Sequence, residues 1–194
     1  EDSTLQRGNG GVLANDTDPD GTSLSAELVD RPANGQLTLA ADGSFRYTPN
    51  PDWNGTDSFS YRPSNGQETG EVVQVRLTVV PVNDAPTLVK ASFQVSSGGA
   101  VTLGSDALVA TDVDSAQSAL RYAVVSVENG HFELRSAPGQ SVSGFSQADL
   151  LAGRVIFRHE PFAERPGVVL RVSDGQTAGN ALAAEVGFTP AGGL

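Results

Sequence analysis

The sequence of 194 residues contains no cysteine and no methionine. Without cysteine the chain forms no disulfide, binds no metal through thiolate and has no thiol nucleophile. No apolar run approaches the ~18 residues that a membrane-spanning helix needs, so we expect no membrane insertion. The absent initiator methionine indicates a fragment of a longer protein, so the lack of a targeting signal carries no weight.

Basic residues are also scarce. The chain has 12 Lys and Arg against 23 Asp and Glu, a formal net charge of −11, and Lys90 is its only lysine. Nucleic-acid binding needs clustered Lys and Arg, so we expect no nucleic-acid partner. An acidic surface attracts cations instead. A cysteine-free, acidic, glycine-rich chain is typical of a bacterial protein, and the composition is compatible with exposure at the cell surface.

The hydrophobic residues alternate with polar ones with a period of two. The pattern is clear in SFRYT (44–48), VQVRLTV (73–79) and LRYAV (120–124), and each such run ends at Gly, Asn, Asp or Pro. Short alternating runs bounded by turn residues predict half-buried antiparallel strands. Only residues 146–151 predict a helical turn, with Ser146 as N-cap and Asp149 at the capping-box position. The fold class is therefore all-β.

The sequence repeats itself once. Asp16 corresponds to Asp112 at an offset of 96 residues, and Asn65 corresponds to Asp174 at an offset of 109. The growing offset predicts an insertion at about 144–153 in the second copy. Two copies of this size predict two tandem immunoglobulin-like antiparallel β-sandwich domains, 1–82 and 87–194. The linker 83–86 lies in PVNDAP (81–86), whose two prolines make it a semi-rigid spacer.

Each copy is predicted to consist of a first strand, a turn and six further strands. The ranges predicted for these six are 12–15, 24–29, 35–39, 45–48, 57–62 and 72–80 in the first copy, and 108–111, 120–125, 130–134, 155–158, 168–172 and 183–189 in the second.

The loops of this arrangement gather acidic residues. In the second copy, Asp112, Asp114 and Asp174 fall at the end of the sandwich where the chain enters, next to Asn83 and Asp84 of the linker. The first copy offers Glu1 and either Asp57 or Asp52 to the same junction. Packed carboxylates repel unless a cation binds, and oxygen donors without cysteine favour Ca²⁺ over zinc or copper. The alternative is that these are plain surface charges.

The first copy carries a denser acidic loop. Asp16, Asp18 and Asp20 precede Gly21 with the spacing of an EF-hand loop. An EF-hand needs flanking helices, whereas both flanks here predict strands, so that fold is rejected. Carboxylates at i, i+2 and i+4 around a glycine turn still suit one Ca²⁺, and a solvated turn is the alternative interpretation. Glu27 is interpreted as a strand residue.

These motifs resemble a known family. VLANDTDPDG (12–21), PANGQL (32–37), FRYTPN (45–50), GTDSFSY (55–61) and PVNDAP (81–86) resemble the bacterial cadherin-like repeats of large adhesins of the RTX, type I-secreted kind. ATDVD (110–114), FSQADL (145–150), VIFRH (155–159) and VSDG (172–175) resemble the related chondroitin-sulfate-proteoglycan (CSPG) repeat. The resemblance thus divides the chain into repeats 1–86 and 87–194.

The resemblance implies calcium-binding, extracellular repeats of a biofilm adhesin. By similarity to cadherins, the ligands are Glu1, Asn83, Asp84, Asp112, Asp114 and Asp174. It also implies that the first strand of the first domain is absent, which leaves an unpaired edge. The departures are Pro81, Ala85, Asn65 and Ser97, which stand where the family pattern has further ligands.

The leading hypothesis is an adhesive extender stiffened by calcium, whose partners are neighbouring repeats and possibly a surface glycan or protein. The alternative is a carbohydrate- or peptide-binding module that uses Trp53 with Asp52 and Asn54, or the insertion at 145–151. Against it, a lone Trp predicts a core anchor, and Phe145 and Leu150 predict core caps.

An enzyme is not expected. His159 and Glu160 are adjacent in a predicted strand and therefore point to opposite faces. The sequence has no nucleophile elbow, phosphate loop or HExxH motif.

Overall fold

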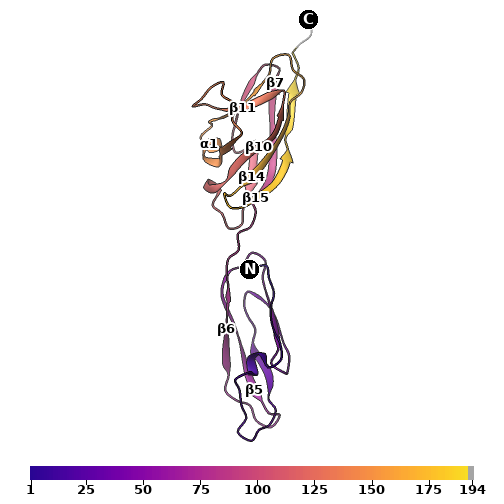
Figure 1. Cartoon of the computed structure of the whole chain (residues 1–194), viewed down its shortest axis with the longest axis vertical. Coiled ribbons are helices and arrows are strands. Elements are labelled where there is room, and N and C mark those ends of the chain that lie inside the picture. The colour runs from indigo at the N-terminus through magenta and orange to yellow at the C-terminus, as the bar shows by residue number, and fades with distance from the viewer. Residues whose placement is uncertain (192–194) are drawn as a thin grey trace. The chain divides into compact units, whose positions relative to one another are not determined.

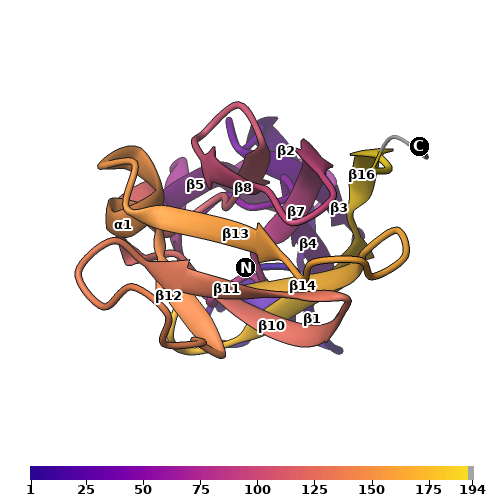
Figure 2. The ribbon, with the colours of Figure 1, turned by 90° about the horizontal axis from the view of Figure 1, so that it is seen from above.

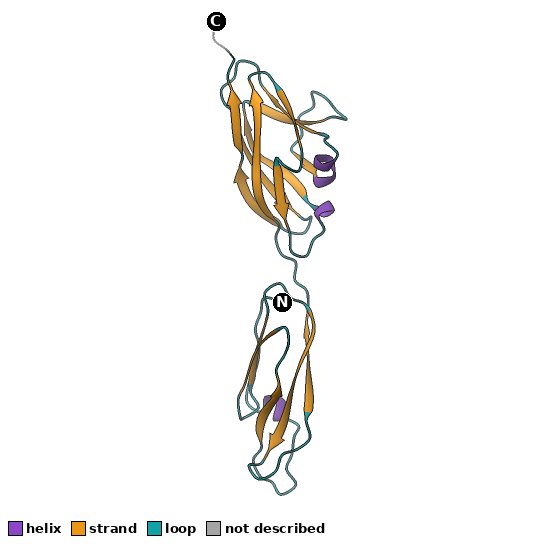
Figure 3. Cartoon of the chain, turned by 180° about the vertical axis from the view of Figure 1, so that it is seen from behind, coloured by secondary structure: helices purple, strands orange, loops and turns teal. Residues whose placement is uncertain are grey.

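The computed structural model describes residues 1–191, so the last three residues of the predicted second domain lie outside the described residues. The chain divides into two compact units, of which the first is Glu1–Val82 and the second begins at Asn83. Strands dominate both units (Figures 1 and 3). The all-β prediction is confirmed. Within residues 1–191, every helix is too short to cross a lipid bilayer.

The first unit packs two antiparallel three-stranded sheets, in the orders β1-β4-β3 and β2-β5-β6. Their elements are β1 (Leu5–Arg7), the 3-10 helix η1 (Gly11–Leu13), β2 (Ser25–Asp30), β3 (Gly35–Leu39), β4 (Phe45–Pro49), β5 (Gly55–Ser64) and β6 (Val73–Val79). The buried aromatic side chains of Phe45, Tyr47, Phe59 and Tyr61 fill the space between the sheets. The alternation that predicts the strands therefore arises because every second residue faces this core.

The β3–β4 hairpin shows how local residues set the register. Gly43 has φ of +84°, and the Asp42 carboxylate accepts a hydrogen bond from the Ser44 N–H at 2.9 Å. Glycine adopts this left-handed conformation without a Cβ clash. The turn fixes the pairing of Leu39 with Phe45.

The predicted strand 12–15 is wrong. The segment forms η1 followed by a turn, because Gly10 and Gly11 have φ of +83° and +32°. Gly11 also packs tightly on the β3–β4 hairpin, where a Cβ would lie 2.0 Å from the Gly43 carbonyl oxygen. Val12 is buried nonetheless and donates its N–H to the same carbonyl at 3.0 Å. The short strand β1, which precedes this segment, was not predicted.

The second unit contains the remaining elements. They are β7 (Thr87–Ser96), β8 (Ala100–Leu103), β9 (Leu108–Thr111), the 3-10 helix η2 (Gln117–Ala119), β10 (Arg121–Glu128), β11 (Gly130–Leu134), β12 (Gly144–Ser146), α1 (Gln147–Leu151), β13 (Val155–His159), β14 (Gly167–Ser173), β15 (Ala178–Ala183) and β16 (Glu185–Thr189).

These strands form sheets β11-β13-β8, β12-β10-β14-β15 and β16-β7-β9. Figure 2 shows β13 between β8 and β11. All pairs are antiparallel except that β16 runs parallel to β7, which the sequence did not predict. Leu103, Leu120, Val155, Phe157 and Leu170 have no exposed surface and form the centre of the core.

The predicted helical turn is present as α1. Ser146 caps α1: its side chain accepts the Asp149 N–H at 3.1 Å, and the Asp149 carboxylate accepts the Ser146 N–H at 3.2 Å. This reciprocal pair is a capping box. Phe145 before the helix and Leu150 within it are buried in the core, as predicted.

The predicted strand 183–189 corresponds to β16 apart from its first two residues, whereas β15 before it was not predicted. β15 pairs with β14, and the chain then changes sheets at Ala184 so that β16 pairs with β7. The small residues of β15, with Gly179 and Ala181 among them, have weak strand propensity, so its pattern was missed. The short strand β8 was also missed.

Candidate metal centres

The linker side of the second unit holds a cluster of carboxylates, defined here as Asp84, Asp112, Asp114 and Asp174. Asp112 and Asp114 follow β9, Asp174 follows β14, and Asp84 precedes β7. The Asp84 N–H donates to Asp114 Oδ2 at 3.1 Å. This bond links two of the four residues directly, and no three of the four carboxylates lie within 4.8 Å of one another among the described residues. This placement follows from the sandwich topology, because both loops lie at the end where the chain enters.

Asp112 has one satisfied and one unsatisfied carboxylate oxygen. Its Oδ1 accepts the N–H groups of Asp114 and Ser115 at 3.2 and 3.0 Å. Its Oδ2 is buried and has no hydrogen-bond partner among the described residues. A buried carboxylate oxygen without a donor costs free energy unless a cation or another donor satisfies it.

Asn83 and Asp174 tie the linker to the loop after β14. The Asn83 amide donates to Asp174 Oδ2 at 2.6 Å and lies 3.3 Å from the Thr177 hydroxyl. Asp174 Oδ1 accepts the N–H groups of Gln176 and Thr177 at 2.7 and 2.6 Å. The bond from the Thr177 N–H, followed by that from Asn83, holds the pKa of Asp174 below its usual value. Asp174 is therefore charged at neutral pH.

This cluster fits a hard divalent cation. Among residues 1–191, Asp112, Asp114 and Asp174 form no ion pair with Arg or Lys. The donors are carboxylate, amide and hydroxyl oxygens, which are the ligands that Ca²⁺ takes, six to eight at a time, at ~2.3–2.6 Å. The two histidines lie on β11 and β13, away from these loops. The donor set and the unsatisfied Asp112 oxygen both favour a calcium site.

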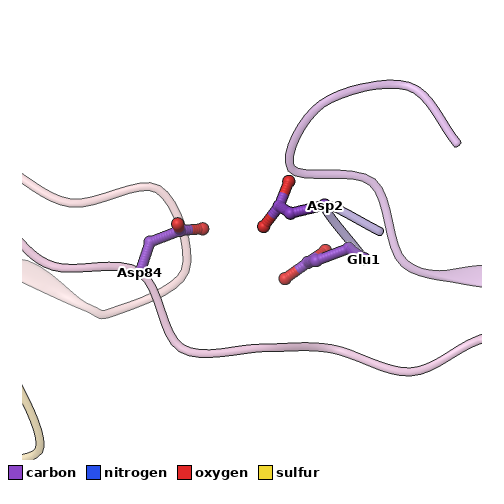
Figure 4. Close-up of side chains that lie close together, drawn as sticks. All are labelled: Glu1, Asp2 and Asp84. Carbon is purple, nitrogen blue, oxygen red and sulfur yellow. The ribbon is translucent and has the colours of Figure 1, made fainter. Parts of the chain in front are cut away.

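Glu1 belongs to the first unit and is held there by three bonds. Its amino group donates to the Val80 carbonyl at 2.6 Å, its Oε1 accepts the Val82 N–H at 2.9 Å, and its Oε2 accepts the Asn54 amide at 3.3 Å. The neighbouring Asp2 carboxylate, which the sequence analysis missed, lies within 4.8 Å of that of Glu1. Figure 4 labels these two side chains and that of Asp84, which follows Val82 by two residues. The ligand role of Glu1 stays a prediction.

The carboxylate of Asp57 has a structural role in the first unit. It is buried, and its carboxylate accepts hydrogen bonds from the N–H groups of Ala33, Asn34 and Ser58 at 3.0, 2.8 and 2.8 Å, and from the Tyr47 hydroxyl at 2.9 Å. Burial alone raises the pKa of Asp57, but these donors outweigh burial and hold the pKa below its usual value. These bonds fix the loop before β3. The ligand role of Asp57 also stays a prediction, and the alternative Asp52 is exposed.

The acidic loop of the first unit borders a cavity of about 340 Å³. Asp16 and Asp18 line it, together with Asn65 and Glu68 of the loop after β5. Asp16 Oδ2 lies 2.8 Å from the hydroxyl of buried Tyr61, and burial and this bond raise the pKa of Tyr61 to about 12. Asp18 Oδ2 accepts the Asn65 amide at 2.9 Å, which is the main reason that the pKa of Asp18 is lowered.

Asp20 does not join this cavity. Its side chain is exposed, and its N–H donates to Asp18 Oδ1 at 2.8 Å to close the turn. The following flank is strand β2, where Glu27 pairs with Arg62 at 3.0 Å, so the strand interpretation of Glu27 is confirmed. The preceding flank is the short helix η1 instead of the predicted strand. One 3-10 turn and one strand still exclude an EF-hand.

The loops after β5 and β14 are built alike. Asn65 Oδ1 accepts the N–H groups of Gln67 and Glu68, as Asp174 Oδ1 accepts those of Gln176 and Thr177. The two repeats therefore place an Asx turn at the same point, and the pairing of Asn65 with Asp174 is confirmed. Sequence analysis did not single out Glu68 and Thr177, which lie at the end of these two turns.

The features behind the alternative hypotheses have other roles. Trp53 is half-buried beside Gly55 and is outside the residues that form the first core, so the core-anchor interpretation is wrong. His159 is buried and Glu160 exposed, which confirms that they face opposite ways. The His159 Nδ1 accepts the Gly98 N–H at 3.2 Å, and its Nε2 lies 2.7 Å from the Glu164 carbonyl oxygen. Both ring nitrogens of His159 therefore have hydrogen-bond partners within the second unit.

Comparison with known families accounts for both units. The model of the bacterial cadherin-like domain matches residues 1–81, and the model of the cadherin-like domain matches residues 86–186. The chain belongs to the cadherin-like family. Domains of this family are generally adhesion modules without enzymatic activity, and cadherin domains generally bind Ca²⁺.

Individual relatives agree with this assignment. Human chondroitin sulfate proteoglycan 4 is 32% identical over 173 residues, which cover 79% of this chain and 7% of the relative. The chain therefore spans less than a tenth of that relative's length. Human CDH23 EC21-23 has a TM-score of 0.55 at 16% identity over 94% of this chain and 64% of its own. Human protocadherin-24 EC1-2 has a TM-score of 0.53 at 14% identity over 88% of this chain and 84% of its own. At these identities the two structures support the fold alone.

Proposed function

We propose that the chain is a pair of calcium-stiffened extender repeats from a bacterial adhesin that is secreted to the cell surface and contributes to biofilms. The observation that carries the proposal is the buried Oδ2 of Asp112, which has no hydrogen-bond donor among the described residues although three other carboxylates share its cluster. Such an oxygen suits a cation ligand.

Calcium bound to this cluster would hold the linker. Asn83 and Asp84 already bond to Asp174 and Asp114 within the second unit. A cation bound by Asp84, Asp112, Asp114 and Asp174 would add coordination bonds between the linker and the loops of the second unit. The linker could then not rotate without breaking some of these bonds. Pro81 and Pro86 further limit the backbone. The linker is thereby stiffened, which is what a spacer between neighbouring repeats requires.

The family supports an extracellular, adhesive role. The match of residues 1–81 to the bacterial cadherin-like domain and the absence of cysteine favour a bacterial source. Similarity to a proteoglycan favours an extracellular location. On this proposal the partners are adjacent repeats of the same polypeptide, and export by type I secretion is part of the same hypothesis.

Thermal unfolding in millimolar Ca²⁺ and in excess chelator tests the calcium site. Extracellular calcium modules bind at ~10⁻⁴–10⁻³ M, and a concentration about 100-fold above Kd stabilises the folded state by ~2.7 kcal/mol per site. We expect calcium to raise the melting temperature of the wild type and to have a much smaller effect on Asp112→Asn.

The matched control is Asp106→Asn. Asp106 is exposed at the opposite end of β9, so its substitution removes the same charge from the same unit but leaves the cluster intact. This variant should respond to calcium like the wild type. A wild-type melting temperature that is equal in calcium and chelator would refute the proposal.

A further inference from the structure

Several asparagines of the chain are followed directly by glycine. They are Asn9, Asn34, Asn54, Asn65 and Asn129. An Asn-Gly pair loses ammonia readily, because glycine has no side chain to keep its backbone nitrogen away from the amide carbon of the asparagine. Whether the nitrogen reaches that carbon depends on how firmly the fold holds the peptide bond between the two residues.

The fold holds this peptide bond where the glycine belongs to a strand. Gly35, Gly55 and Gly130 lie in the ladders of β3, β5 and β11. The carbonyl oxygens of Asn34 and Asn129 also accept backbone N–H groups, at 2.9 and 3.1 Å. A nitrogen fixed in this way cannot swing onto the preceding side chain unless these backbone hydrogen bonds break.

The pair Asn65–Gly66 is held less firmly, in the loop after β5. Gly66 is exposed, and among residues 1–191 nothing but its chain neighbours lies within 4 Å of where its Cβ would be. The Gly66 N–H donates to Ser64 Oγ at 3.1 Å, a bond that must open first. Asn65 Oδ1 accepts the N–H groups of Gln67 and Glu68 at 3.0 and 2.8 Å. These two donors stabilise the negative charge that Oδ1 gains when a nucleophile adds to the amide carbon.

The second unit carries a carboxylate at the corresponding position. Asp174, which is also followed by glycine, has an Oδ1 that accepts two backbone N–H groups as that of Asn65 does. In the first unit the Asn65 amide instead donates to Asp18 Oδ2 at 2.9 Å. Replacement of this amide by a carboxylate would therefore give the first unit the side chain that the second unit has here.

We propose that Asn65–Gly66 is a site of spontaneous deamidation, and that the product makes the adjoining cavity of the first unit a site for a hard divalent cation. The Gly66 nitrogen attacks Cγ of Asn65 and gives up its proton to a base in the solvent. The Cγ–Nδ2 bond breaks, and the amide nitrogen takes up a proton and leaves as ammonia. Water then opens the resulting succinimide at either carbonyl, which gives aspartate or isoaspartate without any oxidant or reductant.

The new carboxylate changes the balance of charge in the cavity. Asp18 loses the amide donor that it now has, and the cavity of about 340 Å³, which Asp16, Asp18 and Glu68 line, gains a further carboxylate. Like charges at hydrogen-bond distance repel unless a cation lies between them. This consequence rests on the calcium-binding function proposed above, whereas the covalent step does not.

Ageing of the whole chain at mildly alkaline pH tests the covalent step. Mass spectrometry of proteolytic peptides measures the loss of ammonia at each Asn-Gly pair and separates aspartate from isoaspartate. We expect Asn65 to react at least about ten-fold faster than Asn34, Asn54 and Asn129, with isoaspartate among its products. A rate at Asn65 no higher than at these three, or a product without isoaspartate, would overturn the proposal.

Calcium titration followed by the amide chemical shifts of residues 16–18 tests the consequence. We expect Asn65→Asp to bind Ca²⁺ at this cavity at least about ten-fold more tightly than freshly purified wild type, because it supplies an additional charged ligand. Asn9→Asp is the matched control. It adds the same charge to the same unit outside the cavity lining, so it should bind Ca²⁺ like the wild type.

Equal calcium affinity of Asn65→Asp and Asn9→Asp would overturn the cation site in the first unit. The calcium response that depends on Asp112 is measured separately in the second unit, so a failure of one proposal is distinguishable from a failure of the other.

Discussion

Buried carboxylates organise loops in both units. In the second unit Glu133 of β11 has no exposed surface and accepts the Arg158 guanidinium at 2.8 Å and the Gly139 N–H at 2.6 Å. Ser141 forms an isolated bridge with Glu133. The long connection between β11 and β12 is thus fastened to the outer face of its own sheet by one side chain, as the loop before β3 is fastened by Asp57.

Glu133→Gln tests this fastening through its pH dependence. The Arg158 guanidinium and the Gly139 N–H hold the pKa of Glu133 below its usual value of 4.5. Because the folded pKa is the lower one, the carboxylate stabilises the fold above the unfolded pKa, and this stabilisation is lost as pH falls through the folded pKa. We expect Glu133→Gln to lower the free energy of unfolding by about 1–3 kcal/mol at pH 7.

The difference from wild type should shrink when unfolding is measured at successively lower pH values below about 4. Glu160→Gln, at an exposed position two residues after Arg158, is the control and should have little effect at any of them. A loss of stability in Glu133→Gln that is the same at pH 3 and pH 7 would show that the charge is not what matters.

At the scale of elements, the two acidic loops differ in how their first carboxylate is satisfied. Tyr61 Oη lies 2.8 Å from Asp16 Oδ2, whereas Asp112 Oδ2 has no such partner among the described residues. The loop of the first unit is therefore closed by its own side chains to a greater degree. If calcium binds as proposed, it should therefore stabilise the second unit more than the first.

A pair of substitutions tests the site of the first unit. If its cavity binds calcium, Asp18→Asn should weaken that binding, because Asp18 lines the cavity with Asp16. Asp20→Asn should have a smaller effect, because the exposed Asp20 is outside the lining. Calcium titration of each variant followed by amide chemical shifts checks this order. The reverse order would contradict the geometry of the loop.

The cap of α1 gives a prediction for the inserted segment. Ser146→Ala removes the acceptor for the Asp149 N–H, and the loss of an N-cap costs about 1 kcal/mol. Ser136→Ala in the exposed connection before β12 is the control. Chemical denaturation measures both. If the two variants are equally stable, the capping box does not hold this helix.

Much of this architecture could be predicted from the sequence, since β3, β9 and β11 have the predicted bounds. Their alternation is strong because one face is buried and the other is solvated. The failures have physical causes. Val12 and Leu13 are apolar, but the preceding pair of glycines turns the chain. The parallel pairing of β16 with β7 depends on contacts between residues about 90 positions apart, which no local pattern records.

At the scale of the whole molecule, two cadherin-like units are joined by a linker whose ends are each tied to their own unit. Glu1 accepts the Val82 N–H in the first unit, while Asn83 and Asp84 bond to Asp174 and Asp114 in the second. The linker is therefore bonded to the first unit up to Val82 and to the second unit from Asn83 onward. The proposed calcium ion reinforces the second set of bonds.

The position of Asp84, Asp112, Asp114 and Asp174 just before or after strands of the second unit could be predicted, because it follows from the strand order alone. The internal bonds of Asp57 could not, since they depend on how the Ala33–Asn34 backbone folds over β5. The exclusion of Asp20 from the cavity likewise depends on the exact course of its turn. The strand that a loop follows is readable from the sequence, whereas the direction of a single side chain is not.

The most direct test of the central claim is the rotational diffusion of each unit, measured by ¹⁵N relaxation with and without calcium. A stiffened linker makes the two units tumble together, so their correlation times should converge in calcium and approach that of one 20.0 kDa body. In excess chelator each unit should tumble faster and independently. Correlation times that are the same with calcium and with chelator would contradict the proposed stiffening.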